Sequence, residues 1–252
     1  MKVPAAASAR PRAREPVAWS EPFAQELFHG AGDLRPAVMV MGRAPRRGEV
    51  RHALEPLIGR DGCLALQAAL LLEALEWARA TEPREILLAH EPADAGRELQ
   101  RLAGDDVHLF PQNGEGISGR VADAVARAHA RSPGSIIVVW PDIPRLRRIH
   151  ADAVLGDLAA GVDLVLGPVF GGGFYLIGLA RPLPVLFSLP EQAWRGPDSF
   201  AALLQAAARA GLETGVLRGE RALHRPADVR AALADPLLPD PVARALRHRA
   251  EA

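Results

Sequence analysis

The residues with the clearest chemical potential form a short basic loop at positions 42–51. Its arginines are Arg43, Arg46, Arg47 and Arg51. A guanidinium group offers a fixed fork of N–H donors that matches phosphate oxygens, so several arginines in one loop can hold one anion. The predicted phosphate-binding residues are Gly42, Arg43, Arg47, Gly48 and Arg51. The alternative is a solvated basic loop. Because exposed loop changes are usually mild, replacing Arg43 and Arg51 with alanine is expected to weaken binding with little loss of stability.

A single aspartate, Asp142, follows the apolar run 136–140 and lies between Pro141 and Pro144. The two prolines stiffen the turn around it. A carboxylate held there could bind a divalent ion that bridges phosphate oxygens. It could equally cap the turn or the following helix, and the residues alone leave both possibilities open.

Gln112 and Arg120 form a third polar group, beyond the apolar run 107–110. Both could contact a nucleotide base or phosphate, and for Arg120 the alternative is an ordinary charge on a helix surface. Metal centres built from cysteine or histidine are not indicated. Cys63 is the only cysteine, and the eight histidines do not have the spacing of metal ligands.

Three consecutive glycines, Gly171–Gly173, separate the apolar runs 164–166 and 174–177. Such short continuous apolar runs are typical of strands buried on both faces. Pro168 cannot donate a ladder hydrogen bond, so the first strand is expected to end there. The glycines allow backbone angles closed to other residues and the close approach of a ligand. A flexible loop between two core strands is the alternative.

The elements that must position these groups alternate along the chain. The predicted strands are 37–41, 85–90, 107–110, 136–140, 164–166, 174–177 and 213–217. The predicted helices are 61–80, 94–102, 120–131, 149–160, 197–210 and 226–234. In the first helix the apolar face is expected to consist of Leu64, Ala68, Leu71, Leu72 and Leu75. This alternation predicts an α/β fold, a mostly parallel sheet with helices on both faces. Ligands then bind at the carboxyl ends of the strands, where the loops 42–51, 141–144 and 169–173 lie.

The chain is interpreted as one domain at 36–235, preceded by an N-terminal arm at 1–35 and followed by a tail at 236–252. Of its 252 residues, 49% are hydrophobic, and 30 basic residues balance 30 acidic ones. This balance, with basic residues not interleaved with aromatics, argues against nucleic acid as a partner. No apolar run approaches the ~18 residues of a membrane span, so a membrane is not expected either. A single cysteine suits the cytoplasm.

Four segments together resemble a known family. G-P-V-F-G-G-G-F-Y-L-I-G-L at 167–179 resembles the G-P-x-x-D-G-G-Y-Y-L-I-G-L signature of bacterial stand-alone glycosyltransferase-like proteins. The segments 41–59, 110–121 and 138–146 are similar to its K-A-P-x-P-G-x-V-K-T-R-L-x-P-x-x-G loop, its glutamine–glycine–arginine segment and its G-x-D-x-P-x-L strand end. That family belongs to the nucleotide-diphospho-sugar transferase superfamily and is distantly related to phospholactate guanylyltransferase. The resemblance implies a single GT-A-like, Rossmann-like domain.

The sequence departs from the family pattern at positions that carry charge. The aspartate before the double glycine is Gly171 here, and the arginine of K-T-R-L is Ala53, although Arg51 keeps the charge of the lysine. Both acids of the family's D-V-D are absent, and His224 stands at the second. The resemblance therefore implies a Mg²⁺ or Mn²⁺ site built from Asp142 and His224. This is a thin ligand set for a hard cation.

The leading hypothesis is a cytoplasmic protein that binds a nucleotide or nucleotide sugar and transfers a glycosyl or nucleotidyl group to a small acceptor. Asp142 and Arg51 are the expected catalytic residues. Phe170 and Gly171–Gly173 are the expected donor or acceptor loop, with Phe170 either lining the pocket or filling the core. The alternative is a degenerate, inactive GT-A-like binding or partner module. The residues do not define the oligomeric state.

Overall fold

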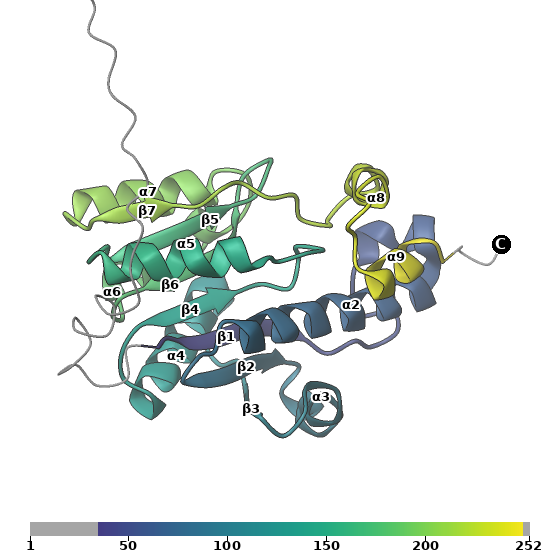
Figure 1. The fold of residues 1–252 in the computed structure, drawn as a ribbon, viewed down its shortest axis with the longest axis horizontal. Coiled ribbons are helices and arrows are strands. Elements are labelled where there is room, and N and C mark those ends of the chain that lie inside the picture. Colours follow the sequence, from purple (N-terminus) through teal and green to yellow (C-terminus); the bar gives the residue numbers. More distant parts are fainter. Residues whose placement is uncertain (1–34, 249–252) are drawn as a thin grey trace, which may run out of the picture. The chain divides into compact units, whose positions relative to one another are not determined.

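The computed structural model describes residues 35–248, which form one compact unit around a central sheet (Figure 1). The arm predicted at 1–35 lies outside these residues except for Arg35. Seven strands form the sheet, in the order β3-β2-β1-β4-β6-β5-β7. Their bounds are β1 Ala37–Arg43, β2 Glu85–Glu91, β3 Val107–Pro111, β4 Ile136–Val139, β5 Leu164–Pro168, β6 Phe174–Leu179 and β7 Thr214–Val216. All pairings are parallel except those of β6, which runs antiparallel to both β4 and β5.

The strands carry apolar side chains on both faces because helices cover both faces. In β1, Val38 and Val40 pack on one side of the sheet, while Met39 packs on the other, and all three are buried. A strand enclosed in this way has no polar face, so its sequence does not alternate. This explains why short continuous apolar runs located the strands correctly.

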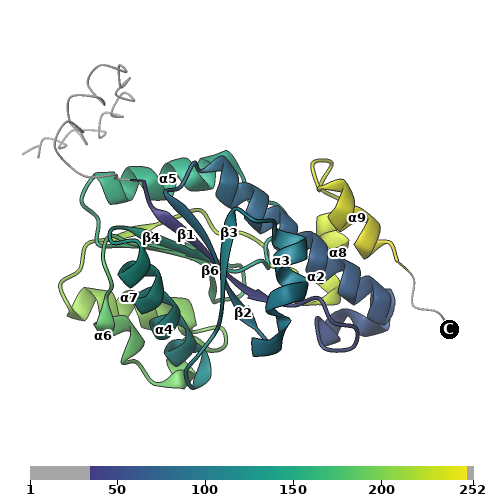
Figure 2. The same cartoon turned by 90° about the horizontal axis from the view of Figure 1, so that it is seen from below.

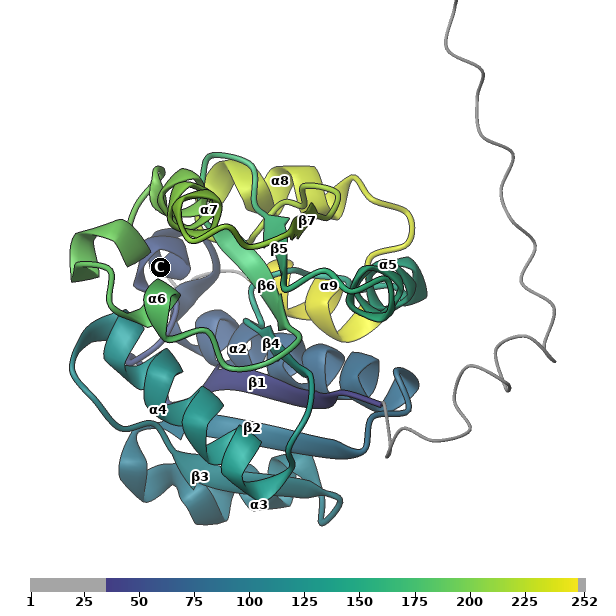
Figure 3. The same cartoon turned by 90° about the vertical axis from the view of Figure 1, so that its left-hand side faces the viewer.

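Two groups of helices form the outer layers (Figures 2 and 3). One core joins the sheet to α2 Glu55–Ala80, α3 Gly96–Ala103 and α5 Arg148–Ala159. The opposite core joins it to α4 Gly116–Arg131, α6 Pro184–Phe187 and α7 Ser199–Arg209. Short 3-10 turns occupy His52–Leu54, Ala93–Ala95 and Glu191–Trp194. The predicted fold class, a mostly parallel α/β sheet between helical layers, is confirmed.

The glycine-rich segment forms the turn between β5 and β6, which pair as antiparallel neighbours. β5 ends at Pro168 as predicted, and the strand register shifts between Gly167 and Pro168. Gly171, Gly172 and Gly173 all have φ close to 90°, a region that other residues rarely adopt. At Gly172 an added Cβ would collide with the carbonyl of Pro197. The turn therefore requires glycine for its shape and its packing against the following segment.

The C-terminal part of the described chain is more structured than its sequence predicts. After α8 Pro226–Leu233, a short helix, α9 Asp240–Leu246, packs with α8 against the first part of α2 (Figure 1). Val242 and Leu246 are buried in this third core. The prediction of a tail at 236–252 is therefore wrong for residues 240–246, which form helix α9. Because α9 is short, with Pro239 before it and Pro241 in its first turn, it has little helical signal of its own and depends on tertiary contacts.

Helix α2 begins six residues before the predicted start and is interrupted at Gly59, whose backbone is not helical. Leu71 and Leu75 are buried as predicted, but Leu64, Ala68 and Leu72 are only partly buried. No helix among residues 35–248 has the length and apolar character needed to cross a membrane.

Candidate functional site

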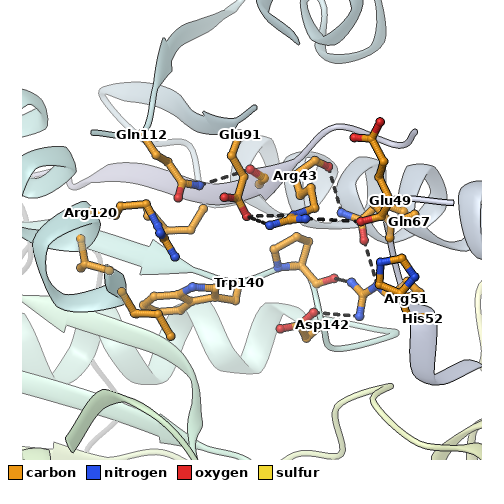
Figure 4. Close-up of a pocket in the computed structure, with 16 residues that line it drawn as sticks. Arg43, Glu49, Arg51, His52, Gln67, Glu91, Gln112, Arg120, Trp140 and Asp142 are labelled. Atoms are coloured by element: carbon orange, nitrogen blue, oxygen red, sulfur yellow. Dashed lines mark hydrogen bonds and ion pairs between the residues drawn. The ribbon is translucent and has the colours of Figure 1, made fainter. Parts of the chain in front are cut away.

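A cavity of about 360 Å³ opens at the carboxyl ends of β1 and β4 (Figure 4). These neighbouring strands mark the point at which the strand order reverses, because β2 and β3 continue to one side and β4 begins the other. Ligands of open α/β sheets bind at such points. The cavity brings together six residues predicted from the sequence, namely Gly42, Arg43, Arg51, Gln112, Arg120 and Asp142.

Arg51 is the most tightly held side chain of this pocket, with only 9% of the side chain exposed. Its Nε donates to Gln67 Oε1 at 2.8 Å, and its terminal nitrogens donate to the carbonyls of Leu223 and Pro141 at 3.3 and 2.9 Å. Nη1 also lies 2.8 Å from Asp142 Oδ1. The backbone of Arg51 adopts the left-handed conformation, with φ of 55°. This conformation is unfavourable for residues other than glycine, so the contacts of the Arg51 side chain must stabilise it. The expectation that Arg51 is exposed is therefore wrong.

Asp142 lies between the guanidinium of Arg51 and the imidazole of His224. Oδ1 faces Arg51, and Oδ2 lies 3.4 Å from Nε2 of His224. Burial by itself raises the pKa of Asp142, but Arg51 and His224 together outweigh burial and lower that pKa to about 2. The same pairing with Asp142 raises the pKa of His224 above its usual value, although partial burial opposes this shift. Asp142 is thus a carboxylate whose charge is already balanced.

This donor set does not fit the divalent ion implied by the sequence resemblance. Mg²⁺ and Mn²⁺ are held by several oxygen ligands, and Asp142 is the one matched carboxylate. Both of its oxygens already have a basic partner: Oδ1 faces the Arg51 guanidinium, and Oδ2 faces the imidazole of His224. Within residues 35–248, no cluster of three or more His, Cys, Asp or Glu side chains is placed to hold an ion. The Arg51 guanidinium occupies the electrostatic position that a metal ion would need.

Arg43 forms the opposite wall of the pocket together with Glu91, at the ends of β1 and β2. Its Nε and Nη2 lie 2.9 and 2.7 Å from Glu91 Oε1, so the two side chains form a closely paired unit. The backbone carbonyl of Arg43 accepts a hydrogen bond from Gln67 Nε2 at 2.9 Å. Gln67 therefore connects Arg43 to Arg51 through helix α2. At Gly42 an added Cβ would press on Leu88, so packing as well as ligand access requires glycine there.

Arg120 is the pocket's uncommitted cation. Among residues 35–248 its side chain has no ion pair or hydrogen bond, and Figure 4 shows it directed toward Trp140. It lies in the second turn of α4. The start of that helix is fixed by the Glu191 carboxylate, which accepts hydrogen bonds from the backbone N–H groups of Ile117 and Ser118. The Arg120 guanidinium, which lines the cavity, is therefore available to bind an anionic group of a ligand.

Trp140 forms an aromatic wall of the same pocket, directly before Pro141 and Asp142. Its ring meets the edge of Phe174 at 5.1 Å between centroids, and Phe174 in turn meets Trp194 at 5.7 Å. This chain of edge contacts holds the indole in place. Sequence reasoning did not assign Trp140 to the site, because an aromatic residue at a strand end is usually a core residue.

Gln112 has a positioning role in the structure. Its side-chain nitrogen donates to the carbonyls of Gly42 and Ala89, at 3.2 and 2.9 Å, and so joins the ends of β1 and β2. Both N–H bonds of the amide are thereby used. Only its oxygen is left to accept a hydrogen bond from a ligand.

Several predicted site residues lie elsewhere. Arg47 pairs with Asp61 on the outside of α2, and neither Arg47 nor Gly48 lines the pocket. Phe170 and the three glycines are at the same edge of the sheet, but β6 separates their strand from β4. Phe170 is 63% exposed and lies beneath the guanidinium of Arg221, at 5.8 Å. It therefore neither lines this pocket nor fills the core.

Four polar residues that line the site, Glu49, His52, Gln67 and Glu91, were not predicted. Gln67 carries a recognisable signal, since it is a polar residue within the apolar sequence of α2. Glu91 carries none, because an acid at the end of a strand is common. Its pairing with Arg43 depends on the register that places the last residues of β1 and β2 side by side.

Solved structures of other proteins share this fold. The crystal structure of a "putative nucleotide-diphospho-sugar transferase from Desulfovibrio desulfuricans G20" is similar with a TM-score of 0.74 and 22% identity, over 84% of this chain and 94% of that one. A 4-diphosphocytidyl-2C-methyl-D-erythritol synthase is similar with a TM-score of 0.51 and 12% identity, over 77% and 94%. This chain therefore shares the α/β fold of these two structures, as predicted.

Residues 74–191 match the family described as "Uncharacterized protein conserved in bacteria (DUF2064)". No curated protein matches the chain. The matched segment includes β2, α4, Trp140, Asp142 and the turn between β5 and β6. The basic loop after β1 lies outside it.

The burial of Arg51 leads to a prediction about stability. Arg51→Ala should lower the free energy of unfolding by about 3 kcal/mol, because Asp142 and Gln67 lose their partner inside the protein. Urea unfolding measures this change. Arg181→Ala, which removes an exposed ion pair with Asp163, is the control and should cost less than about 1 kcal/mol. A loss of similar size in both variants would contradict the anchoring role of Arg51.

A second prediction concerns the titration of His224. Because Asp142 raises the pKa of His224 in the folded protein, the pair contributes stability below the unfolded pKa, and this contribution is lost as pH rises through the folded pKa. Asp142→Asn should therefore lower the His224 pKa, as followed by NMR of the imidazole. Asp152→Asn removes an exposed acid of α5 and should leave that titration in place. An unchanged His224 pKa in Asp142→Asn would disprove the pairing.

Proposed function

We propose that the pocket between β1 and β4 binds a nucleotide or a nucleotide sugar. The observation that carries this proposal is the uncommitted Arg120 facing Trp140 at the point where the strand order reverses. A nucleotide combines an anionic phosphate chain with a flat, weakly polar ring. The two residues offer one partner for each of these parts, a guanidinium for the phosphates and an indole for the ring.

The walls of the pocket support this division. Trp140 lies with Ile117 and Val121 of α4, which gives one part of the cavity an apolar lining. Arg43 and Arg120 supply donors to the remainder. At about 360 Å³ the cavity lies within the range of small-molecule sites, which are usually apolar with a few placed polar groups.

We further propose that the protein transfers a glycosyl or nucleotidyl group from the bound nucleotide to a small acceptor in the cytoplasm. Charge developing on the leaving phosphates would be stabilised by guanidinium groups, as arginine clamps do for transferring phosphoryl groups. Arg120 is placed for this role. Arg51 acts indirectly, because it fixes Asp142 and the turn that carries Trp140. The buried free Cys63 suits a reducing compartment.

A second candidate function is nucleotide binding without catalysis. It is favoured by one observation, the neutralisation of Asp142 by Arg51 and His224. An enzyme of this class that uses a metal ion needs carboxylate charge to hold it, and Asp142, the one carboxylate matched to the family pattern, is already paired. Release of pyrophosphate or nucleoside diphosphate from a bound donor, in the presence of an acceptor, distinguishes the active from the inactive protein.

The first test compares whole nucleotides with inorganic tripolyphosphate by calorimetry. Arg120→Ala should weaken both about tenfold, because it removes a charge-assisted contact to phosphate. Trp140→Leu should weaken nucleotides about tenfold but leave tripolyphosphate unchanged, because stacking acts only on the ring. Trp140→Phe should restore part of the nucleotide affinity.

Arg101→Ala, an exposed arginine of α3 away from the pocket, is the matched control and should bind like the unmodified protein. Equal losses for nucleotide and tripolyphosphate in Trp140→Leu would show that the indole does not contact the ring. Unchanged affinity in Arg120→Ala would rule out this pocket as the phosphate site.

The pairing of Asp142 predicts how metal ions affect binding. Nucleotide affinity should be nearly the same with Mg²⁺, with Mn²⁺ and with a chelator, because Asp142 is already balanced by Arg51 and His224. Asp142→Asn should likewise leave the metal response unchanged. Calorimetry under the three conditions measures this. Tighter nucleotide binding with metal that is lost in Asp142→Asn would instead establish Asp142 as a metal ligand.

A further inference from the structure

A second cavity, of about 230 Å³, lies on the other side of the turn that carries Asp142. Its floor is apolar and includes Ile143, Leu223 and Ala232. Its rim is basic, and the arginines that line it are Arg145, Arg147, Arg218 and Arg221. Two carboxylates, Glu220 and Asp235, line it as well. The lining thus has more arginines than carboxylates. None of these arginines lines the proposed nucleotide pocket.

Three of the four ion pairs of these arginines are long. The nitrogen–oxygen distances are 3.4 Å for Arg145–Asp235, 3.5 Å for Arg147–Glu220, 3.9 Å for Arg218–Glu220 and 3.2 Å for Arg221–Asp228, where Asp228 lies outside the lining. In the first pocket the closest contacts of Arg43 and Arg51 with their acids are 2.7 and 2.8 Å. Each guanidinium carries five N–H donors. Most of the donors around the second cavity are therefore available to another acceptor.

Glu220 is shared among several donors. Nδ1 of the buried His150 accepts a hydrogen bond from the backbone N–H of Arg147, so Nε2 carries the proton and donates to Glu220 at 3.0 Å. The same Oε1 atom of Glu220 faces Arg147 and Arg218. One carboxylate that serves three donors cannot neutralise both arginines fully. An oxyanion of a ligand would accept the hydrogen bonds that the Glu220 carboxylate cannot accept.

The second cavity is next to the first, and the segment that carries Asp142 and Ile143 separates them. The backbone N–H of Leu223 donates to the carbonyl of Asp142 at 2.9 Å, and the Leu223 carbonyl accepts from Arg51. Asp142 faces the first pocket, whereas Ile143 and Leu223 face the second. The exposed Phe170 lies near this region, since its backbone N–H donates to the backbone carbonyl of Glu220 and its ring lies against Arg221. The glycine turn after β5 thus contacts two residues that line the second cavity.

We propose that this second cavity binds a small anionic molecule through a phosphate or carboxylate group, and that a hydroxyl group of this molecule is the acceptor of the transfer. The hydroxyl oxygen would form the new bond to the transferred group and release its proton, while the bond between that group and the departing nucleoside diphosphate or pyrophosphate breaks. The oxyanion would contact Arg145, Arg147 and Arg218, while the apolar floor would contact its carbon skeleton. The binding site stands on its own contacts, whereas its role as acceptor site rests on the function proposed above. In this proposal the turn at 170–173 lies near the acceptor, because Phe170 contacts Glu220 and Arg221.

The test uses sn-glycerol 3-phosphate and succinate as separate probes, which distinguish a phosphate ligand from a carboxylate ligand. Calorimetry is performed in the Arg120→Ala background, so that phosphate binding in the first pocket is suppressed. At least one probe should bind, and Arg145→Ala with Arg218→Ala should weaken it at least about tenfold. Arg218→Lys should retain part of the affinity, because it keeps the charge.

Arg148→Ala, an exposed arginine at the start of α5 that pairs with Asp152, is the control and should bind the probe normally. Arg218 is 76% exposed, so Arg218→Ala alone provides a folded variant if the double substitution unfolds the protein. If neither probe binds, or if the probe binds the Arg145 and Arg218 variants equally well, the second site is overturned.

The outcomes separate this proposal from the proposed function. Nucleotide binding that depends on Arg120 and Trp140, with no probe binding, would retain the function and remove the second site. Probe binding that depends on Arg218, with no nucleotide binding, would retain an anion site but remove its role as an acceptor site. If the Arg218 substitution weakens binding of the probe but leaves the affinity for nucleotide unchanged, the result supports both proposals.

Discussion

The geometry of the pocket depends on the buried contact between Arg51 and Asp142. This contact joins the loop after β1 to the turn after β4, and through Gln67 it also includes helix α2. The carbonyls of Pro141 and Leu223 complete the surroundings of the guanidinium. Removing one member would leave the others without partners in a poorly hydrated place, which is far costlier than losing an exposed ion pair. The two halves of the sheet are thereby held in one arrangement where the ligand would bind.

The same contact determines which chemistry the pocket can perform. A carboxylate that balances an arginine has little charge left for a cation, so Asp142 differs from a metal-binding aspartate although it occupies the corresponding place in the sequence. The two cavities then have distinct electrostatic characters. The first has close ion pairs and one uncommitted arginine, whereas the second has long ion pairs and shared carboxylates. Function in this fold therefore depends on how side chains are paired, and the fold alone does not specify it.

The strands could be predicted from the sequence because full burial gives each of them a short continuous apolar run, as at 136–139. The edge of the sheet that carries the site followed from this order. The apolar face of α2 was partly wrong because helices and sheet enclose it on more than one side, so that Leu64 and Leu72 do not lie on a single buried stripe. The pairing of Arg43 with Glu91 requires strand register, and the burial of Arg51 requires contacts with residues more than 90 positions away along the chain. Neither is encoded in local spacing.

The close pairing of Arg43 with Glu91 affects how a ligand would reach the pocket. At distances beyond about 10 Å in physiological salt, a paired arginine and glutamate present almost no field, so they attract a distant anion weakly. This pair would then contribute little to the long-range attraction of the ligand, and its contribution to the association rate would vary little with ionic strength. Recognition begins only when the ligand is close enough to compete with Glu91 for the guanidinium. Such an entrance discriminates by the shape of the arriving group more than by its charge.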